Sequence, residues 1–292
     1  MKAISILIPT FNGVCTSLVA DLQRQAEALA VSYEIIVADD GSTDADTIAE
    51  NRAVNQLPHC RYIEQPRNVG RAAIRNFLAR QAQFDWLLFI DSDMTVVNDR
   101  YLSNYLSDQT ADVIDGGVCI GGDAESLRHN LRYRYEKASE HEHTAERRRQ
   151  APYRDFHTAN FLIQRELMRS HPFDDRFRYY GYEDVLFGKQ LRQDRIAITH
   201  IDNPMGFCTF ESNADFVAKT EEGLRTLHTF RSELRGYSRL LTFVDGIHVP
   251  AVLTFIRLSH RLLRGVVRKN LCSSHPFPKL LSLYKVGYFV SL

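Results

Sequence analysis

The sequence has little of what marks a secreted or membrane-spanning protein. Its five cysteines among 292 residues are scattered and form no Cys-x-x-Cys pair, which favours free thiols in a reducing compartment over a disulfide framework. No stretch approaches the ~20 consecutive apolar residues of a membrane-spanning helix. The apolar run near the N-terminus breaks at Pro9, so it predicts a first β-strand and not a signal peptide. We therefore expect a cytoplasmic protein.

Acidic residues are missing from the last part of the sequence. Residues 246–292 contain seven basic residues and no Asp or Glu, whereas the rest of the chain has 29 basic against 36 acidic residues. This asymmetry indicates an electrostatic partner for the basic tail. The tail has no aromatic interleaving or reading motif, so nucleic acid is not the partner that we expect.

The basic tail contains an amphipathic helical pattern between residues 250 and 269. Four arginines (Arg257, Arg261, Arg264 and Arg268) fall on one face of a helical wheel, and apolar residues occupy the broad opposite side. Such a helix can lie in a membrane interface, or it can pack its apolar side on the rest of the protein. We expect residues 250–292 to contact the inner face of the cell membrane, as in a peripheral membrane protein.

Strand and helix patterns alternate along the first two thirds of the chain. β-rich runs at 4–8, 33–38 and 86–90 alternate with helical spacing at 17–29, 43–55 and 70–83. This alternation predicts an α/β fold with a Rossmann-like, mostly parallel central sheet flanked by helices. After Pro204 no strand pattern is clear, and 213–234 and 250–269 have helical spacing. We expect a catalytic domain over residues 1–205 and a helical C-terminal extension over residues 206–292.

One buried strand runs directly into two carboxylates. Residues 86–90 are apolar, and Asp91-Ser92-Asp93 follows at once. In open α/β sheets, ligands bind at the carboxyl ends of the strands. Mg²⁺ and Mn²⁺ typically bind one or two carboxylates together with phosphate oxygens. Because Asp-x-Asp also occurs in ordinary turns, the prediction of a metal and diphosphate site depends on the motifs that accompany it.

Two of these motifs end strands at the same edge of the sheet. Asp39-Asp40 precedes Gly41-Ser42, and carboxylates there can accept hydrogen bonds from a base or from ribose hydroxyls; an N-cap of the next helix is the alternative. Pro9-Thr10-Phe11-Asn12 ends the first strand with a rigid bend that can flank a nucleotide base.

Two helix starts complete the pattern. Arg71 and Arg75 lie four residues apart after Asn68-Val69-Gly70, so both can point toward phosphates, although solvated surface arginines have the same spacing. Glu183-Asp184 begins a helix after a glycine-aromatic loop. A carboxylate there can take a proton from an incoming hydroxyl, and general-base catalysis of this kind raises the rate ~10²–10⁴-fold. Alternatively, the carboxylate merely complements the helix dipole. The order of the five motifs favours catalysis.

With these motifs in this order, the chain resembles the inverting glycosyltransferases of family 2, which have the GT-A fold. The resemblance covers residues 1–205 and implies a metal-dependent enzyme with Mn²⁺ or Mg²⁺ as its cofactor. It implies transfer of a sugar from a nucleotide-diphospho-sugar, commonly a UDP-sugar, to a hydroxyl of a glycan or lipid-linked acceptor. For a protein with this tail, we expect a role in cell-surface polysaccharide synthesis.

The resemblance also implies roles for single residues. The residues expected to bind the nucleotide-sugar are Pro9, Thr10, Phe11, Asp39, Asp40, Asn68, Gly70, Arg71, Arg75, Asp91 and Ser92. Asp91 and Asp93 are expected to hold the metal, Asp184 to be the base, and Glu183 to position the acceptor. Many relatives have a histidine as a further metal ligand; here His200 is the nearest candidate, and Phe207 stands where the histidine is expected.

Two other functions fit parts of the pattern. A metal-dependent nucleotidyltransferase shares the acidic metal site but usually carries a basic, glycine-rich phosphate loop near its N-terminus, and residues 9–16 contain no Lys or Arg. A non-catalytic nucleotide-binding or sugar-binding module needs no general base, so Asp184 argues against it. We expect residues 123–160 and 205–245 to select the acceptor, with 127–154 forming a helix and a loop that cover the site.

Overall fold

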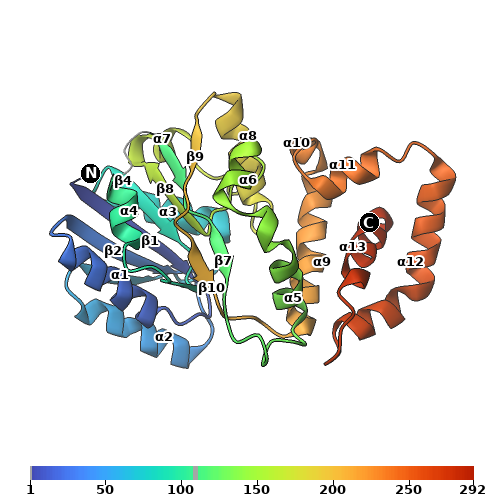
Figure 1. Cartoon of the computed structure of the whole chain (residues 1–292), viewed down its shortest axis with the longest axis horizontal. Helices are drawn as coiled ribbons and strands as arrows, with labels where there is room; N and C mark the ends of the chain where they lie inside the picture. Colours follow the sequence, from blue (N-terminus) through green and yellow to red (C-terminus); the bar gives the residue numbers. More distant parts are fainter. Residues whose placement is uncertain (1, 108–110) are drawn as a thin grey trace.

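The computed structural model describes residues 2–107 and 111–292, and it places an α/β core beside a group of C-terminal helices (Figure 1). In the first part of the chain, strands and helices alternate as the sequence predicts. The elements in order are β1 (Ala3–Thr10), α1 (Thr16–Ala28), β2 (Ser32–Asp39), α2 (Ala45–Asn51), η1 (Arg52–Gln56), β3 (Cys60–Glu64), α3 (Arg71–Gln81), β4 (Trp86–Ile90), β5 (Met94–Thr95), α4 (Tyr101–Ser107), β6 (Val113–Asp115) and β7 (Val118–Ile120).

The middle of the chain is more helical than we expected. The stretch 127–154, which was expected to be a helix followed by a loop, contains α5 (Leu131–Ser139), η2 (Glu140–Glu142) and α6 (Ala145–Gln150). Arg148 of α6 is buried, so this part of the stretch is held in the protein and is not a surface loop. The elements that follow are β8 (Asn160–Gln164), α7 (Arg165–Ser170), α8 (Glu183–Gln193), β9 (Ile198–His200) and β10 (Met205–Phe207).

Among the described residues, seven strands form the central sheet in the order β3-β2-β1-β4-β8-β6-β9. The pairs β1–β2, β1–β4, β2–β3 and β6–β9 are parallel, and β8 runs antiparallel to both of its neighbours. The prediction of a mostly parallel sheet is therefore confirmed. Because β2, β1 and β4 are parallel neighbours, their carboxyl ends, which carry Asp39, Thr10 and Asp91, meet at one edge of the sheet.

The centre of the sheet is buried on both faces. One apolar core packs against it from α3, α7 and α8, and the other from α1 and α4. Leu87 to Ile90 in β4 are all fully buried. A strand covered on both faces has a continuous apolar sequence in place of an alternating one, which explains the run that precedes Asp91.

A second, three-stranded sheet in the order β5-β10-β7 lies beside the site. Its strand β10 pairs antiparallel with β5 and parallel with β7. The prediction of no strand after Pro204 is wrong here, because a strand of three residues is too short to show a periodic pattern. β10 also crosses the boundary that we expected between residues 205 and 206.

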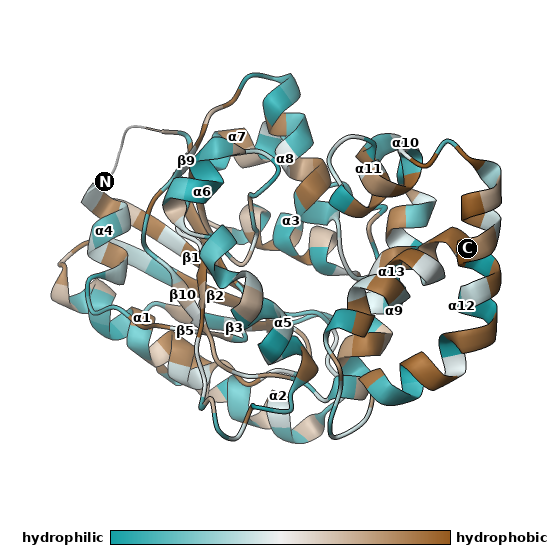
Figure 2. Cartoon of the chain, turned by 45° about the vertical axis from the view of Figure 1, so that its right-hand side comes forward, coloured by the Kyte–Doolittle hydropathy of each residue, from teal (hydrophilic) through white to brown (hydrophobic). Residues whose placement is uncertain are grey.

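The C-terminal part is helical, as expected. Its helices are α9 (Asn213–Thr229), α10 (Arg231–Leu234), α11 (Arg239–Asp245), α12 (Pro250–Leu271) and α13 (Lys279–Ser291). The single helix expected over 213–234 is interrupted at Phe230, and α11 and α13 were not anticipated. α13 lies between α9 and α12 and contacts both (Figures 1 and 2). Within the described residues, no helix has the length and apolar character needed to cross a membrane.

Candidate active site

Two adjoining cavities lie beyond the carboxyl edge of the sheet. The larger one, of about 580 Å³, is lined by the end of β1, the loop after β2 and the start of α3, and we call it the β1 cavity. The smaller one, of about 300 Å³, is lined by α5 and the start of α8, and we call it the α8 cavity. Six residues line both cavities: Arg71, Asp91, Asp93, Arg132, Tyr180 and Lys219.

The β1 cavity gathers ten of the eleven residues that were expected to bind a nucleotide-sugar. These are Pro9, Thr10, Phe11, Asp40, Asn68, Gly70, Arg71, Arg75, Asp91 and Ser92. Asp40 connects two of the motifs, because its carboxylate accepts hydrogen bonds from the backbone N–H groups of Val69 (2.8 Å) and Gly70 (3.0 Å). Burial raises the pKa of Asp40 even though these two donors favour its ionised form.

Asp39 is the exception. Its side chain is buried, and its carboxylate accepts hydrogen bonds from the backbone N–H of Ser42 (2.7 Å) and from the Tyr62 hydroxyl. Asp39 does not line the β1 cavity. The structure therefore gives it a local role, which is to shape the turn after β2, in place of the nucleotide contact that we expected.

Close backbone packing shapes the rim of the β1 cavity. Gly70 has φ of +94°, and a Cβ atom added to it would lie 2.8 Å from the carbonyl oxygen of Arg178. Gly41, with φ of +71°, is similarly crowded: an added Cβ would lie 2.4 Å from the carbonyl carbon of Arg67. Both positions require glycine, because an L side chain there is strained and also collides with backbone. The loops after β2 and before α3 are thus fixed around the cavity.

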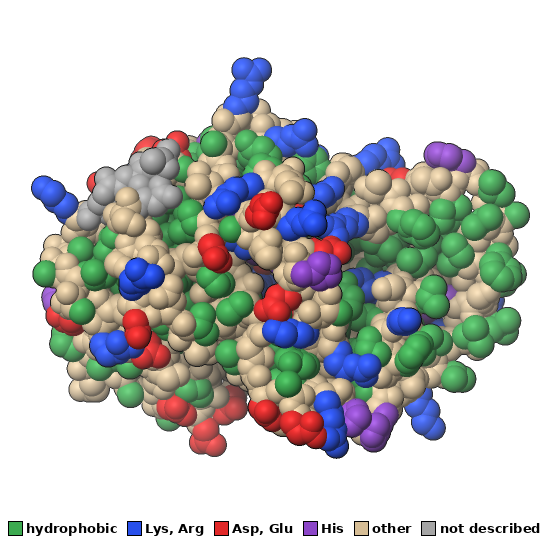
Figure 3. Space-filling view, in the orientation of Figure 1, with side chains coloured by type: hydrophobic (Ala, Val, Ile, Leu, Met, Phe, Trp, Pro, Cys, Tyr) green, Lys and Arg blue, Asp and Glu red, His purple; other side chains and the backbone are tan. Residues whose placement is uncertain are grey.

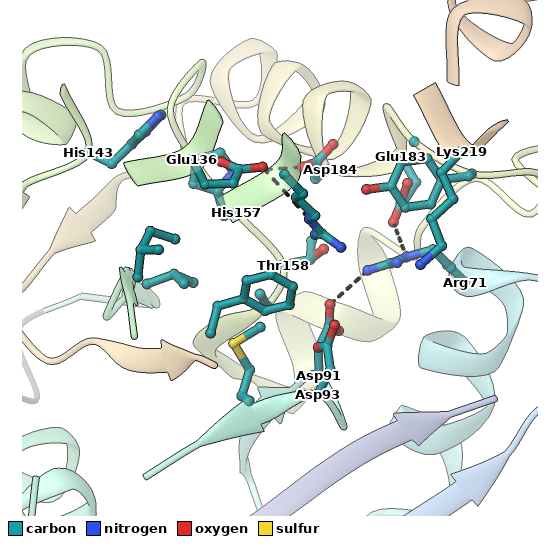
Figure 4. A pocket seen from close by; sticks show the side chains of 18 of the residues that line it. Arg71, Asp91, Asp93, Glu136, His143, His157, Thr158, Glu183, Asp184 and Lys219 are labelled. Atoms are coloured by element: carbon teal, nitrogen blue, oxygen red, sulfur yellow. Dashed lines mark hydrogen bonds and ion pairs between the residues drawn. The ribbon is translucent and has the colours of Figure 1, made fainter. Parts of the chain in front are cut away.

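Four charged side chains, Arg71, Arg75, Asp91 and Glu183, form a cluster beside the two cavities. Figure 4 shows three of them, Arg71, Asp91 and Glu183. Arg75 donates to Asp91 Oδ1 (2.6 Å), and Arg71 donates to Asp91 Oδ2 (2.7 Å). Both arginines also contact Glu183 Oε1, Arg71 at 3.0 Å and Arg75 at 3.2 Å. Burial disfavours the ionised form of Asp91, but the two guanidinium groups outweigh this and hold its pKa below the usual value.

This cluster changes the roles that we expected for its members. Arg75 is only 1% exposed, so its guanidinium serves to hold Asp91 and Glu183. Glu183 is also buried, and its Oε1 atom is held by both arginines. It lines the α8 cavity, and its expected role in positioning the acceptor stays a prediction. Arg71, in contrast to Arg75, is 41% exposed, so its side chain also reaches the solvent of the cavities.

Asp93 faces the space shared by the cavities. Desolvation and the neighbouring Asp91 raise its pKa, against the opposing effect of Arg71 and Arg132. The guanidinium of Arg132 lies 4.2 Å from the ring centre of Phe207, at the position where a histidine was expected. Phe207 therefore contributes an apolar wall and a support for a cation at this point.

Of the two carboxylates expected to hold a divalent cation, Asp93 faces the cavities, whereas both oxygens of Asp91 accept hydrogen bonds from Arg75 and Arg71. In the part of the chain that the structure describes, no group of three or more His, Cys, Asp and Glu side chains is arranged to hold a metal. An ion at this site would therefore be held by one or two carboxylates and completed by phosphate oxygens, the arrangement that Mg²⁺ prefers. The free carboxylate of Asp93 in a cavity wide enough for a diphosphate agrees with this arrangement.

His200 does not belong to this site. It lies at the end of β9, fully buried, with Nδ1 3.2 Å from Asp115 Oδ2 and Nε2 2.9 Å from the carbonyl oxygen of Pro152. Arg148 completes this buried group, with Nε 3.2 Å from His200 Nδ1. Because both ring nitrogens have protein partners and His200 lines neither cavity, the structure does not support it as a metal ligand.

Asp184 lies at the start of α8 and lines the α8 cavity only. Tyr182 precedes the helix with φ of +71°, and this turn directs Glu183 toward the arginines and Asp184 toward His157. His157 Nδ1 lies 3.9 Å from Asp184 Oδ2. Burial favours the neutral form of each group, but their mutual attraction outweighs it: the pKa of Asp184 is lowered and that of His157 is raised. Asp184 is thus held as a carboxylate beside an open cavity.

Comparison with known proteins decides the family. Residues 5–171 match the family model described as Glycosyl transferase family 2. The chain belongs to this family. The matched segment contains β1 to β8, and so it includes every residue of the β1 cavity from Pro9 to Asp93 and also His157.

Named relatives are similar to parts of the chain. An uncharacterized glycosyltransferase of Haemophilus influenzae is 35% identical over 103 residues, which cover 34% of this chain and 40% of that protein. The hyaluronan synthase of Pasteurella multocida is 24% identical over 285 residues, covering 85% of this chain and 29% of the synthase. The chain therefore spans less than half the length of each of these relatives.

Solved structures share the fold. A Staphylococcus aureus TarS fragment (residues 1–349) in complex with UDP-GlcNAc superimposes with a TM-score of 0.53 at 16% identity, covering 100% of this chain and 90% of the fragment. The mannosyltransferase PcManGT of Pyrobaculum calidifontis, in complex with GDP-Man and Mn²⁺, gives a TM-score of 0.54 at 13% identity, covering 98% and 84% of the two chains. At these identities the likeness shows the GT-A fold.

The site of this family 2 chain contains side chains that sequence reasoning did not single out. His157, Arg132, Glu136 and Lys219 all line the α8 cavity. They come from the loop before β8, from α5 and from α9, which are separated from the five motifs by many residues. The densely charged sequence 127–154 was the only signal for Arg132 and Glu136, and its charges could not be told apart from those of a solvated helix. His157 and Lys219 lie outside that stretch.

Proposed function

We propose that the chain is an inverting glycosyltransferase that moves a sugar from a UDP-sugar to a hydroxyl of a glycan or lipid-linked acceptor, in the synthesis of a cell-surface polysaccharide. One observation carries the proposal: the two cavities share Asp91 and Asp93, and Asp184 lies on one side of them only. This arrangement suits a donor in the β1 cavity, an acceptor in the α8 cavity and a reacting carbon between them.

The donor's nucleoside fits the outer part of the β1 cavity. The Phe11 ring is 49% exposed there, so it can pack on a base, and the backbone of the loop after β1 can reach the ribose. The diphosphate then lies toward Arg71, Arg132 and Lys219, the cations that line both cavities. The UDP-GlcNAc and GDP-Man complexes of two proteins with the same fold support a nucleotide-sugar as the ligand.

Asp93, with Asp91 beside it, would hold Mn²⁺ or Mg²⁺ against the diphosphate, where the cation would neutralise charge on the leaving group. The chain supplies further positive charge from its own side chains. Arg71 remains protonated, because Asp91 and Glu183 raise its pKa against the effect of burial. Arg132 is held by Glu211 (2.8 Å) and by the Phe207 ring, so its charge is fixed close to Asp93.

Asp184 is the general base of the proposed reaction. The acceptor oxygen attacks the anomeric carbon, its proton passes to an Asp184 oxygen, and the bond to the diphosphate breaks with its electron pair leaving on the nucleotide. A single displacement of this kind inverts the anomeric configuration. His157 has a positioning role, because its charge keeps Asp184 ionised and ready to accept the proton.

The acceptor fits the α8 cavity. Its walls include the rings of Tyr180, Tyr182 and Phe207 next to Glu136 and His143. Aromatic faces beside polar groups suit a sugar ring, which has apolar faces and hydroxyl edges. The relative named as a hyaluronan synthase supports a saccharide acceptor.

The test is turnover of nucleotide-sugars followed by NMR. The full chain is incubated with Mn²⁺ and single UDP-, GDP- and CDP-sugars, with and without a mixture of oligosaccharide acceptors. We expect release of UDP from one UDP-sugar and a product of inverted anomeric configuration. Retention of configuration contradicts the proposed step. Release of inorganic diphosphate from a nucleoside triphosphate and a sugar phosphate would instead identify a nucleotidyltransferase.

A further inference from the structure

Helix α12 has more apolar surface than its neighbours cover. Leu253, Ile256 and Val267 pack inward, in apolar clusters shared with α9 and α13. Further apolar side chains of the helix remain exposed, and we call them the outer face of α12: Val252, Phe255, Leu258, Leu262, Leu263 and Val266. The structure thus divides the apolar side of the predicted amphipathic helix into a packed part and an exposed part.

The outer face is continuous. At ~100° per residue, its six members fall within an arc of about 140° that borders the packed side. Phe255, Leu262 and Val266 are 71%, 81% and 73% exposed. Figure 3 shows hydrophobic side chains gathered over α12 on the side of the molecule away from the α/β core. Contiguous apolar surface of this kind marks an interaction site.

The charges around the outer face are all of one sign. Arg257 donates to the carbonyl oxygen of Val290 (3.1 Å), and Arg268 pairs with Glu221 (2.8 Å), so these two stabilise the packing of the helix. Within the ranges that the structure describes, Arg261, Arg264 and Lys269 have no ion-pair partner, and residues 246–292 contain no acidic side chain. On the helical wheel, Lys269 falls inside the arc of the outer face and Arg261 falls about 60° from its edge, whereas Arg264 falls on the opposite side of the helix. Arg261 and Lys269 are therefore the cations available to an anionic partner of this face.

We propose that the outer face of α12 docks on an anionic lipid bilayer, with its apolar side chains in the interface and Arg261 and Lys269 at the lipid phosphates. An amphipathic helix with apolar and basic side chains binds such surfaces by apolar burial together with electrostatic attraction. A second copy of the chain is disfavoured as the occupant. Two outer faces in contact would bring these cations together with no acidic side chain of the tail between them.

The docking does not depend on the transfer reaction, because no residue of the outer face lines either cavity. The two proposals can therefore fail separately. Flotation reports lipid binding, whereas the thermal shift caused by a nucleotide reports the β1 cavity. A variant that loses flotation but keeps the thermal shift is folded and has lost only the membrane contact.

The experiment is flotation of the full chain with two kinds of vesicle: phosphatidylcholine alone, and phosphatidylcholine with about one third phosphatidylglycerol, a content high enough to give a negative surface potential. We expect flotation with the anionic vesicles only, and its loss in about 0.5 M NaCl, where surface charge is screened. The variant Leu262→Asp/Val266→Asp should bind at least tenfold more weakly. The vesicle affinity of Arg261→Gln/Lys269→Gln should fall roughly fivefold for each charge removed.

Val97→Asp is the matched control. Val97 is 51% exposed and follows β5 in the α/β part of the chain, so its replacement adds one of the two negative charges away from α12 and should leave flotation unchanged. Equal flotation of wild type and Leu262→Asp/Val266→Asp overturns the proposal, as does the absence of flotation with anionic vesicles. A wild-type dimer that this double variant converts to a monomer, without vesicle binding, overturns it in favour of a second copy.

Discussion

Arg75 Nη2 lies 2.6 Å from Asp91 Oδ1, and the arginine side chain is 1% exposed. This contact fixes the first carboxylate of the Asp91-Ser92-Asp93 motif before any ligand arrives. Asp93 faces the cavities, and the positive charges of Arg71 and Arg132 act on it from nearby. It is therefore the carboxylate of the motif that is free to bind a cation. The two acids of the motif therefore have different roles, although their sequence positions are symmetrical about Ser92.

Replacing Arg75 with methionine should destabilise the protein strongly. The substitution leaves Asp91 and Glu183 buried with a single shared cation, and removal of one partner of a buried pair costs ~3–5 kcal/mol. Urea unfolding of both proteins measures the difference. Arg52→Met is the matched control, because its pair with Glu64 is exposed on both sides and is screened by solvent, so the loss of stability should be much smaller. Equal losses in the two variants would contradict a structural role for Arg75.

Asp184→Asn should abolish transfer without affecting donor binding. A general base contributes ~10²–10⁴-fold, so kcat should fall by that factor, while Kd for the donor stays constant because Asp184 does not line the β1 cavity. Steady-state kinetics and calorimetric titration measure the two quantities. Asp194→Asn, at the other end of α8 and exposed, should leave both unchanged. A large rise in donor Kd for Asp184→Asn would place Asp184 at the donor instead.

The pH dependence of kcat/KM should report the contact between His157 and Asp184. His157 lowers the pKa of Asp184, so the base stays ionised as the pH falls. His157→Gln removes this effect, and the acid limb of the profile should move to higher pH. His143→Gln removes a second histidine of the same cavity that has no contact with Asp184, and its acid limb should stay in place. An unchanged acid limb in His157→Gln would show that His157 does not tune the base.

The same pair has a consequence for stability. Asp184 has a lowered pKa. Its contribution to the free energy of unfolding is therefore fully present above its unfolded-state pKa and is lost as the pH falls through its folded-state pKa. His157 has a raised pKa, so its contribution is present below its unfolded-state pKa and is lost as the pH rises through its folded-state value. The pair therefore stabilises the fold between these two limits, and the difference in unfolding free energy between wild type and His157→Gln should shrink on either side.

Gly70→Ala should damage the β1 cavity. The added Cβ would lie 2.8 Å from the carbonyl oxygen and 2.9 Å from the Cα of Arg178, and backbone cannot move aside as a flexible side chain does. We expect a stability loss of about 1–3 kcal/mol together with weaker donor binding. Gly236→Ala is a matched control: its φ of +81° carries the same kind of strain, but nothing lies within 4 Å of the added atom. Donor binding that is weakened equally in both would exclude the collision as the cause.

The sequence predicted the edge of the sheet well because the signals there are local. A strand buried on both faces must be a continuous apolar run, and polar residues directly after it must lie at its carboxyl end; Asp91 and Asp93 follow from this reasoning alone. The shared face of Arg71 and Arg75 follows in the same way from helical spacing. What spacing could not show was the partner of each charge, because Glu183 comes from α8, more than 100 positions away.

The errors have the same origin. His200 is close in sequence to the place where a metal ligand was expected. However, β9 pairs with β6, and this places His200 Nδ1 next to Asp115 at the end of β6 and away from the cavities. Asp39 and Asp40 are adjacent, but successive side chains of an extended chain point in opposite directions, so the two carboxylates have different surroundings. Asp39 accepts hydrogen bonds from the Ser42 backbone and the Tyr62 hydroxyl. His157 gave no signal, because the loop before β8 has neither a motif nor a periodic pattern.

The most direct measurement is a thermal-shift panel with UDP, GDP, CDP and their sugar conjugates, each with and without Mn²⁺, on wild type and Asp93→Ala. A ligand at about 100 times its Kd stabilises the folded state by ~2.7 kcal/mol. We expect a Mn²⁺-dependent shift with UDP and one UDP-sugar in wild type, and its loss in Asp93→Ala, whose carboxylate faces both cavities. The absence of a shift with every nucleotide would contradict the presence of a donor site at the end of β4.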